Sequence, residues 1–297
     1  MIDSGTTQNG TTESGTMPLG HEQMDDPHGE VMVDQLDLAA ELAGSADAVA
    51  TEDVAGYTLW LADDALILAQ QLSKWIAHAP ELEEDVALGN IALDLLGHAR
   101  SLLRYAGSAS GRTEDDLAYF RDEPDFRCAW MVQQDNGDFA HTIVRQLVMA
   151  TYMFALYSRL QASTDETLAA IAAKAVKEVE YHRDHAVQWT LRLAGGTEES
   201  RARTERALTD LWPFVGELFR DTPAIEHLAE RGIAVLPSSL EAECAEVFAA
   251  VLAEEDLEVP QCQPSSAGGR HGSHFSSLGY ILAEMQVLAR QHPGATW

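Results

Sequence analysis

From Tyr57 onward, apolar residues recur at intervals of three and four, and no segment shows sustained alternation of apolar and polar residues. That spacing is the period of an α-helix with one buried face. We therefore predict an all-α protein with helices near 57–78, 81–106, 138–162, 165–194, 199–220, 238–255 and 276–291. The first four are long enough to form a four-helix bundle, and the others are additional C-terminal helices.

Turn-forming residues separate the predicted helices. Pro80 is expected to end the first helix and to start the second, Asn136-Gly137 marks the turn before the third, and Gly195-Gly196 ends the fourth. The proline- and glycine-rich stretch 260–273 is too long for a simple connection. We expect it to be irregular and to pack on the body or on a partner.

Acidic residues outnumber basic ones throughout the chain, 48 to 19, for a net charge of -29. Such a field repels nucleic acid and anionic membranes, so we expect neither as a partner. Residues 1–54 contain no lysine or arginine and are rich in Gly, Ser and Thr, which predicts a disordered acidic N-terminal extension before a helical domain at 55–297. Within that extension only 31–42 has the pattern of a short helix. Acid enrichment with few lysines also favours a halophilic protein over an ordinary acidic one.

The cysteines are odd in number and widely spaced, without a C-x-x-C motif, so we predict free thiols rather than disulfides or a zinc site. No apolar stretch reaches the ~18 residues that a transmembrane helix needs, and the N-terminus lacks a basic patch followed by an apolar run. We expect a cytoplasmic protein. The three cysteines are Cys128, Cys244 and Cys262.

Two of the predicted bundle helices carry a histidine on their apolar face. His98 follows the spacing of the second helix, and His182 follows that of the fourth. Each has a carboxylate four residues earlier, Asp94 before His98 and Glu178 before His182. Residues four apart on a helix are neighbours, so we predict that each histidine is satisfied by the carboxylate of its own helix.

A bundle that binds two irons draws one Glu from each of two helices and a Glu-x-x-His pair from each of the other two. Here Leu95 and Val179 stand at the glutamate positions. The inward stripe of the third helix has Ala150 and no carboxylate, and the first helix offers Asp63, with Asp64 on the adjacent line. We predict a degenerate site with no metal-binding, catalytic or cofactor-binding residue, leaving one mononuclear metal or an active di-iron centre as alternatives. The degenerate site comprises Asp63, Asp94, Leu95, His98, Ala150, Glu178, Val179 and His182.

Other chemical candidates are weaker. His185 is displaced from the apolar stripe, and we expect it to be solvated. His271 and His274 are too few for a closed metal site. Gly268-Gly269-Arg270 is similar to a phosphate-contacting loop, but neither a P-loop nor G-x-G-x-x-G accompanies it.

Several ordered motifs resemble those of the structural subunits of bacterial ring-1,2-phenylacetyl-CoA epoxidase, the monooxygenase of phenylacetate degradation. The resemblance covers about residues 57–297 and leaves out the acidic extension. Its motifs lie at 78–83, 93–100, 121–123, 136–140, 174–178, 278–286 and 293–297.

The resemblance implies a ferritin-like four-helix bundle that is itself inactive and supports a homologous di-iron catalytic subunit. It also implies a complex with further subunits, including a reductase with FAD and an iron–sulfur centre that takes electrons from NADPH, while this chain binds no cofactor. The partner's two glutamates align with Leu95 and Val179. Two alternatives stay open: a metal-dependent oxidase or oxygenase that uses His98 and His182, and a free-standing ferritin-like binding protein.

Overall fold

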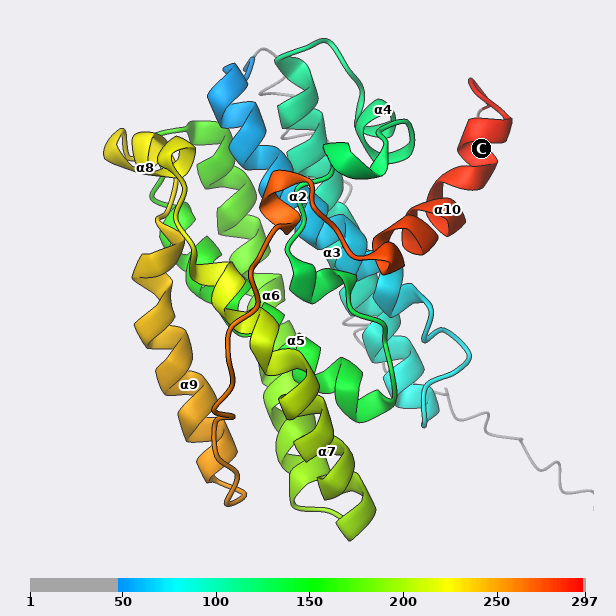
Figure 1. Ribbon diagram of the computed structural model, residues 1–297. Helices are drawn as coiled ribbons and strands as arrows, with labels where there is room; N and C mark the ends of the chain where they lie inside the picture. Colours follow the sequence, from blue (N-terminus) through cyan, green and yellow to red (C-terminus); the bar gives the residue numbers. More distant parts are fainter. Residues whose placement is uncertain (1–47, 296–297) are drawn as a thin grey trace, which may run out of the picture. The chain divides into compact units, whose positions relative to one another are not determined.

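Long helices dominate the computed structural model, which describes residues 48–295 (Figure 1). Within this range the chain forms α-helices and short 3-10 helices and no strand, so the predicted all-α class is confirmed. The predicted helix at 31–42 lies outside the described residues. The four longest helices are α2 (Glu52–Ser73), α3 (Leu82–Ser108), α5 (Phe139–Leu160) and α6 (Glu166–Ala194).

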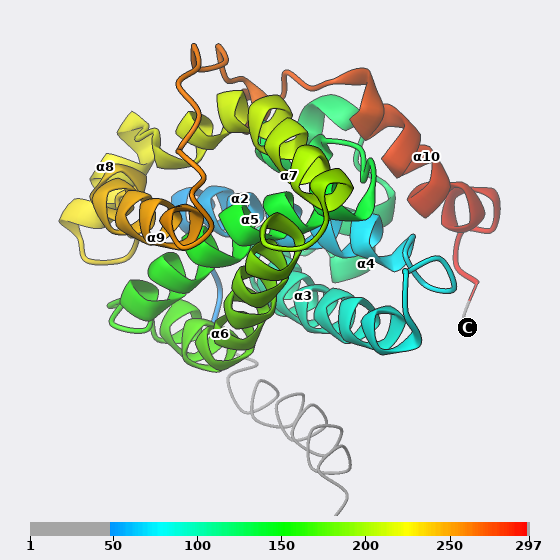
Figure 2. The same ribbon diagram turned by 90° about the horizontal axis from the view of Figure 1, so that it is seen from below.

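The four long helices form the bundle, in which α2 packs on α3, α5 packs on α6, and α3 meets α6. Residues 60–69 of α2 and 142–153 of α5 are buried without interruption, so both helices are covered on all sides. On α3 and α6 the buried residues recur every three or four positions, which leaves one face exposed. Figure 2 shows α3 and α6 on one side of α2 and α5, and α7 on the other, with α9 at the left of the view.

Shorter elements cover the remaining faces of the bundle. The helix α7 packs on α5 and α6, α9 packs on the same two helices, and α10 lies against α4 and α2. The predicted helix at 276–291 coincides with α10, whereas α4 and α8 are too short to show a period in the sequence. These elements are α4 (Glu114–Tyr119), η1 (Glu123–Asp125), η2 (Trp130–Gln133), α7 (Glu198–Leu211), η3 (Trp212–Phe219), α8 (Pro223–Glu230), η4 (Pro237–Leu240), α9 (Glu241–Ala253), η5 (Gly269–His271) and α10 (Ser276–Gln291).

Two predicted helix boundaries are wrong. The first helix ends at Ser73 instead of continuing to 78, because the connection turns through Ala77 with a φ of 64° and Asp85 accepts hydrogen bonds from two of its amides. The predicted helix at 199–220 ends at Leu211 and continues as the 3-10 helix η3. Pro213 has no N–H to donate and its ring clashes with the preceding turn, so an α-helix cannot continue through it.

The helical body includes residues before the predicted boundary at residue 55. Ala50 is buried and donates its backbone N–H to the Ser108 hydroxyl at the end of α3, 2.9 Å away. Glu52 is already the first residue of α2. Residues 48–54 therefore belong to the helical body.

The three cysteines are free thiols, as predicted, and they differ in burial. Cys128 and Cys244 are buried, Cys262 is exposed, and all three are free. Burial raises the pKa of Cys244 to about 12, which keeps that thiol protonated. Among the helices of residues 48–295, none is both long and apolar enough to cross a bilayer.

Candidate functional site

His98 and His182 face each other where α3 meets α6, with ring centroids 6.5 Å apart. Both are buried, at 4% and 2% exposure, as the apolar stripes predicted. Leu95 and Val179, one turn earlier on the same two helices, are also fully buried. The apolar side chains thus fill the positions at which an iron-binding bundle would place glutamates.

Each histidine is paired with the carboxylate of the other helix. His98 Nε2 lies 2.5 Å from Glu178 Oε2, and His182 Nε2 lies 3.0 Å from Asp94 Oδ2. The predicted pairing within each helix is therefore wrong. Nε2 is the ring nitrogen farthest from the backbone, so it reaches the neighbouring antiparallel helix. His98 Nδ1, the nearer nitrogen, has no hydrogen-bond partner among the described residues.

A third pair extends this arrangement. His185 Nε2 lies 2.8 Å from Glu84 Oε2, and both side chains are nearly buried, so the prediction of a solvated His185 is wrong. We call the three pairs the α3/α6 ladder: His98–Glu178, His182–Asp94 and His185–Glu84. In two antiparallel helices, the residue number on one helix falls as its partner's number on the other rises. His98–Glu178 and Asp94–His182 follow this rule, so the sequence contains a signal for the two inner pairs.

The ladder lies in a partly desolvated environment between α3 and α6. Burial lowers the pKa of His182, and the hydrogen bond to Asp94 opposes that shift without reversing it. A neutral His182 then donates its Nε2–H to the Asp94 carboxylate, which fixes the tautomer. The ladder carboxylates keep some contact with solvent, with side-chain exposures of 22% for Glu178, 17% for Asp94 and 11% for Glu84.

These residues do not fit a di-iron centre. Between residues 48 and 295, no three His, Cys, Asp or Glu side chains converge as a ligand set for a metal ion. The Nε2 of each ladder histidine is taken up by a carboxylate, and Ala150 on α5 supplies no ligand. A di-iron centre needs roughly four carboxylates and two histidines around one point.

Asp63, predicted as part of the degenerate site, pairs with residues of the 121–127 segment instead. It is fully buried on α2 and binds both Nη atoms of Arg121, at 3.0 and 2.5 Å, and the backbone N–H of Arg127. Its neighbour Asp64 accepts from Arg270 Nη2 at 2.6 Å and from the backbone N–H of Ala129, and burial raises its pKa against the opposing charge of Arg270. We call these two ion pairs, Asp63–Arg121 and Asp64–Arg270, the α2 arginine cluster. They fasten the 121–129 and 269–271 segments to α2.

The glycine loop binds a carboxylate of the chain itself. Gly268 and Gly269 donate their backbone N–H groups to Glu217 Oε1, at 3.1 and 2.9 Å. A Cβ on Gly269 would lie 2.1 Å from the Cys128 carbonyl oxygen, so only glycine fits there. His274 is held by Gln133 and by the Phe126 carbonyl. The loop therefore packs on the body, one of the two expected outcomes, and its amides are already occupied.

A pocket of about 730 Å³ lies beside α2, and none of the eight residues of the predicted degenerate site lines it. Its walls come from the start of α2, the 112–127 segment, α8 and η5. The pocket could not be predicted from the sequence, because its lining comes from segments far apart in the chain that only the fold brings together.

Comparison with known proteins gives two matches. Residues 38–297 match the family model described as Phenylacetic acid catabolic protein. The chain is also 48% identical over 243 residues to one of the subunits of the 1,2-phenylacetyl-CoA epoxidase of Escherichia coli (strain K12). That match covers 81% of this chain and 98% of the relative.

Proposed function

This chain belongs to the phenylacetic acid catabolic protein family, and we propose that it is a non-catalytic structural subunit of a multicomponent phenylacetyl-CoA ring epoxidase in phenylacetate catabolism. In this proposal a homologous subunit holds the di-iron centre that activates O2. A reductase subunit with FAD and an iron–sulfur centre supplies electrons from NADPH. This chain acts by binding and supporting the catalytic subunit, in the cytoplasm.

The α3/α6 ladder is the observation that carries the non-catalytic role. Histidine and carboxylate groups are present between α3 and α6, but they are paired with each other instead of converging on one point. A metal ion would have to break these hydrogen bonds to reach the histidines, and the side chains of Leu95 and Val179 have no atom that could bind it. Breaking a buried hydrogen bond costs roughly 1–3 kcal/mol when its partner stays unsatisfied.

The outer face of α3 supports a subunit role. Leu82, Val86, Leu93 and Leu96 are 38–75% exposed and are spaced by four, seven and three residues, so they lie on one face of the helix. Gly89 falls on the same line, and a Cβ there would meet nothing within 4 Å. Such a seam of large apolar side chains fits against a helix of another subunit.

Reconstitution tests the proposal directly. We expect the double variant His98→Gln, His182→Gln to assemble with the other subunits and to support epoxidation of phenylacetyl-CoA at a rate close to that of the parent complex. Glutamine keeps a hydrogen-bonding side chain but is a poor metal ligand. Loss of turnover in a fully assembled complex would favour the alternative, an oxidase or oxygenase that uses these histidines.

A second experiment tests the α3 face. Leu93→Glu places a charge in the middle of the exposed seam, so we expect the variant to lose co-purification with the catalytic subunit while its helix content stays unchanged. Ile76→Glu is the matched control, because Ile76 is 58% exposed and lies off the seam. Equal co-purification of both variants and the parent would remove this face from the interface.

A further inference from the structure

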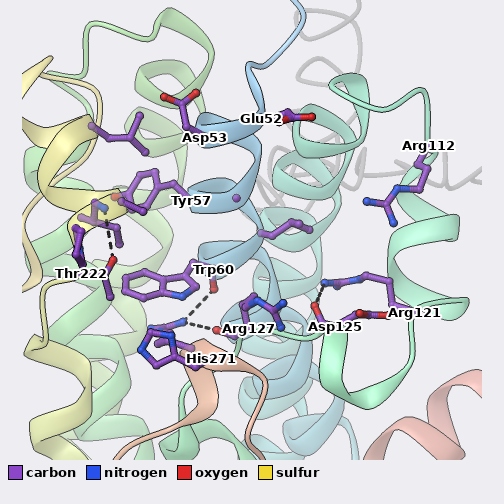
Figure 3. A pocket seen from close by; sticks show the side chains of 17 residues that line it. Glu52, Asp53, Tyr57, Trp60, Arg112, Arg121, Asp125, Arg127, Thr222 and His271 are labelled. Atoms are coloured by element: carbon purple, nitrogen blue, oxygen red, sulfur yellow. Dashed lines mark hydrogen bonds between the residues drawn. The ribbon is translucent and has the colours of Figure 1, made fainter.

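The pocket beside α2 combines basic and apolar walls (Figure 3). Four of the chain's sixteen arginines line it, although the chain as a whole is strongly acidic. Tyr57 and Trp60 from α2 and the apolar residues of α8 supply the apolar lining, and the Arg270 guanidinium lies over the Trp60 ring at 4.3 Å. The lining arginines are Arg112, Arg121, Arg127 and Arg270.

Two of these arginines have no capacity left for a ligand's charge. Arg121 is neutralised by Asp63, and its guanidinium also donates to backbone carbonyls of Leu117 and Asp125. Arg270 is neutralised by Asp64 and donates to two backbone carbonyls. Both belong to the α2 arginine cluster, and their role is to hold the pocket walls.

Arg127 differs from these two, because within residues 48–295 it forms no ion pair. Its Nη1 donates to the carbonyls of Pro124 and Phe126, both at 2.7 Å, which anchors one side of the guanidinium. Nε and Nη2 have no acceptor in the described part of the chain. These two atoms form the edge that binds carboxylate and phosphate groups with two parallel hydrogen bonds.

Arg112 adds a second arginine that forms no ion pair with the described residues, although its charge contributes to the lowered pKa of Asp116. Its Nε donates to the Ser110 hydroxyl, and no carboxylate of the described residues pairs with it. Figure 3 shows Arg112 reaching in from the segment after α3, while Arg127 lies between Trp60 and Asp125. A ligand head bound to Arg127 would have the Trp60 side of the pocket beside it to receive an apolar body.

We propose that this pocket binds a small organic anion with a carboxylate or phosphate-monoester head on an aromatic or aliphatic body. The head binds the free edge of Arg127 with Arg112 nearby, and the body lies between Trp60 and α8. A pocket of about 730 Å³ is within the usual size for such ligands. The proposal does not depend on the chain's place in an epoxidase.

Three carboxylates also line the pocket and set a limit on affinity. Asp53 is paired with Arg231, which leaves Glu52 and Asp125 as exposed acids in the lining. Their repulsion of an anion is screened by solvent and salt. Glu52→Gln should therefore tighten anion binding, and the gain should shrink at high salt.

Calorimetric titration of the full chain tests the proposal with four probes: phenyl phosphate, benzoate, inorganic phosphate and benzyl alcohol. We expect the two aromatic anions to bind at one site and to bind more tightly than inorganic phosphate or the neutral alcohol. Arg127→Met should weaken phenyl phosphate binding by at least about tenfold, the effect of losing a bidentate charge-assisted contact. Arg127→Lys keeps the charge but cannot form two parallel hydrogen bonds. Its affinity for phenyl phosphate should therefore lie between those of the parent and of Arg127→Met.

Arg290→Met is the matched control, because it also removes one arginine and Arg290 lines a different surface hollow. Circular dichroism checks that each variant is folded, and Arg112→Met provides a second test should Arg127→Met unfold. Binding that survives both arginine substitutions would overturn the proposal, as would absence of binding by both aromatic anions. If inorganic phosphate or benzyl alcohol bound as tightly as the two aromatic anions, the pocket would not recognise both a charged head and an apolar body, and the proposal would be overturned.

Discussion

The α3/α6 ladder and the α2 arginine cluster both place carboxylates inside a helical bundle, but they satisfy them differently. In the cluster, Asp63 and Asp64 have side-chain exposures of 0% and 3%, and each is paired with an arginine. In the ladder the carboxylates are 11–22% exposed, and each is paired with a histidine. A fully buried carboxylate requires a permanent cation and several donors, whereas a partly hydrated one can be satisfied by a neutral imidazole.

The two regions therefore have different functions in the molecule. The cluster fastens the connections after α3 and before α10 to the helix α2, and its two arginines line the pocket. The ladder joins two helices that each keep an exposed face, and in our proposal it fills the place where an iron-binding homologue would carry its ligands. The following predictions test this division, beginning with the largest expected effect.

Removing one charge from the cluster should cause the greatest loss of stability. Asp63→Asn leaves Arg121 buried without its counter-charge, and breaking a buried pair in this way costs roughly 3–5 kcal/mol in unfolding free energy. Urea unfolding followed by circular dichroism measures the loss.

Asp122→Asn is the control for that substitution. Asp122 pairs with Arg290 at the surface and its side chain is 77% exposed, so the change should stay within about 0.5 kcal/mol. If Asp63→Asn were as mild as this control, the cluster would not be the anchor that we describe.

A double-mutant cycle distinguishes pairing across the helices from pairing along one helix. We expect His98→Ala and Glu178→Ala to be coupled by about 0.5–1.5 kcal/mol, the usual net contribution of one hydrogen bond. His98→Ala and Asp94→Ala should be nearly additive, because Asp94 binds His182 instead. Coupling of the second pair without the first would restore the pairing expected from sequence spacing.

The ladder should make stability depend on pH in the mildly acidic range. Burial lowers the pKa of His182, so the unfolded chain takes up this proton at a higher pH than the folded chain. The stabilisation is complete above about pH 6.5 and is lost as pH falls through the lower folded-state pKa. Urea midpoints measured across this range should decline towards acid, and His182→Gln should reduce the decline.

The decline should be reduced rather than abolished in that variant. Burial also lowers the pKa values of His141 and His274, whose protons act on stability in the same direction. The groups facing His182 are Asp94 and His98 on α3 and Glu178 on its own helix. An unchanged acid profile in His182→Gln would assign the pH dependence to the other two histidines.

The smallest expected effect is that of salt on stability, which should differ between exposed and buried carboxylates. Net charge is -29, and screening reduces repulsion among exposed acids, so we expect the thermal midpoint to rise with KCl. The penalty of Asp63→Asn should stay the same at every salt concentration, because buried pairs are screened little. Full stability in dilute buffer with no gain from KCl would contradict the halophilic interpretation.

Periodicity predicted the helices of the bundle and the inward direction of His98 and His182, because both depend only on spacing along one helix. It did not predict which carboxylate each histidine binds, since that depends on how α3 and α6 are placed against each other. Asp63 was misassigned for a similar reason: its partner Arg121 lies 58 positions away in an irregular connection, where helical spacing gives no position. For the same reason the sequence did not show that the four pocket arginines lie together.

Iron content of the isolated chain tests the non-catalytic role most directly. The chain should be expressed in iron-rich medium, separated from its partners, and analysed for metal beside the variant His182→Ala. We expect far less than one iron per chain in both proteins. Stoichiometric iron in the parent chain that disappears in His182→Ala would contradict the account and would make this chain a metalloprotein in its own right.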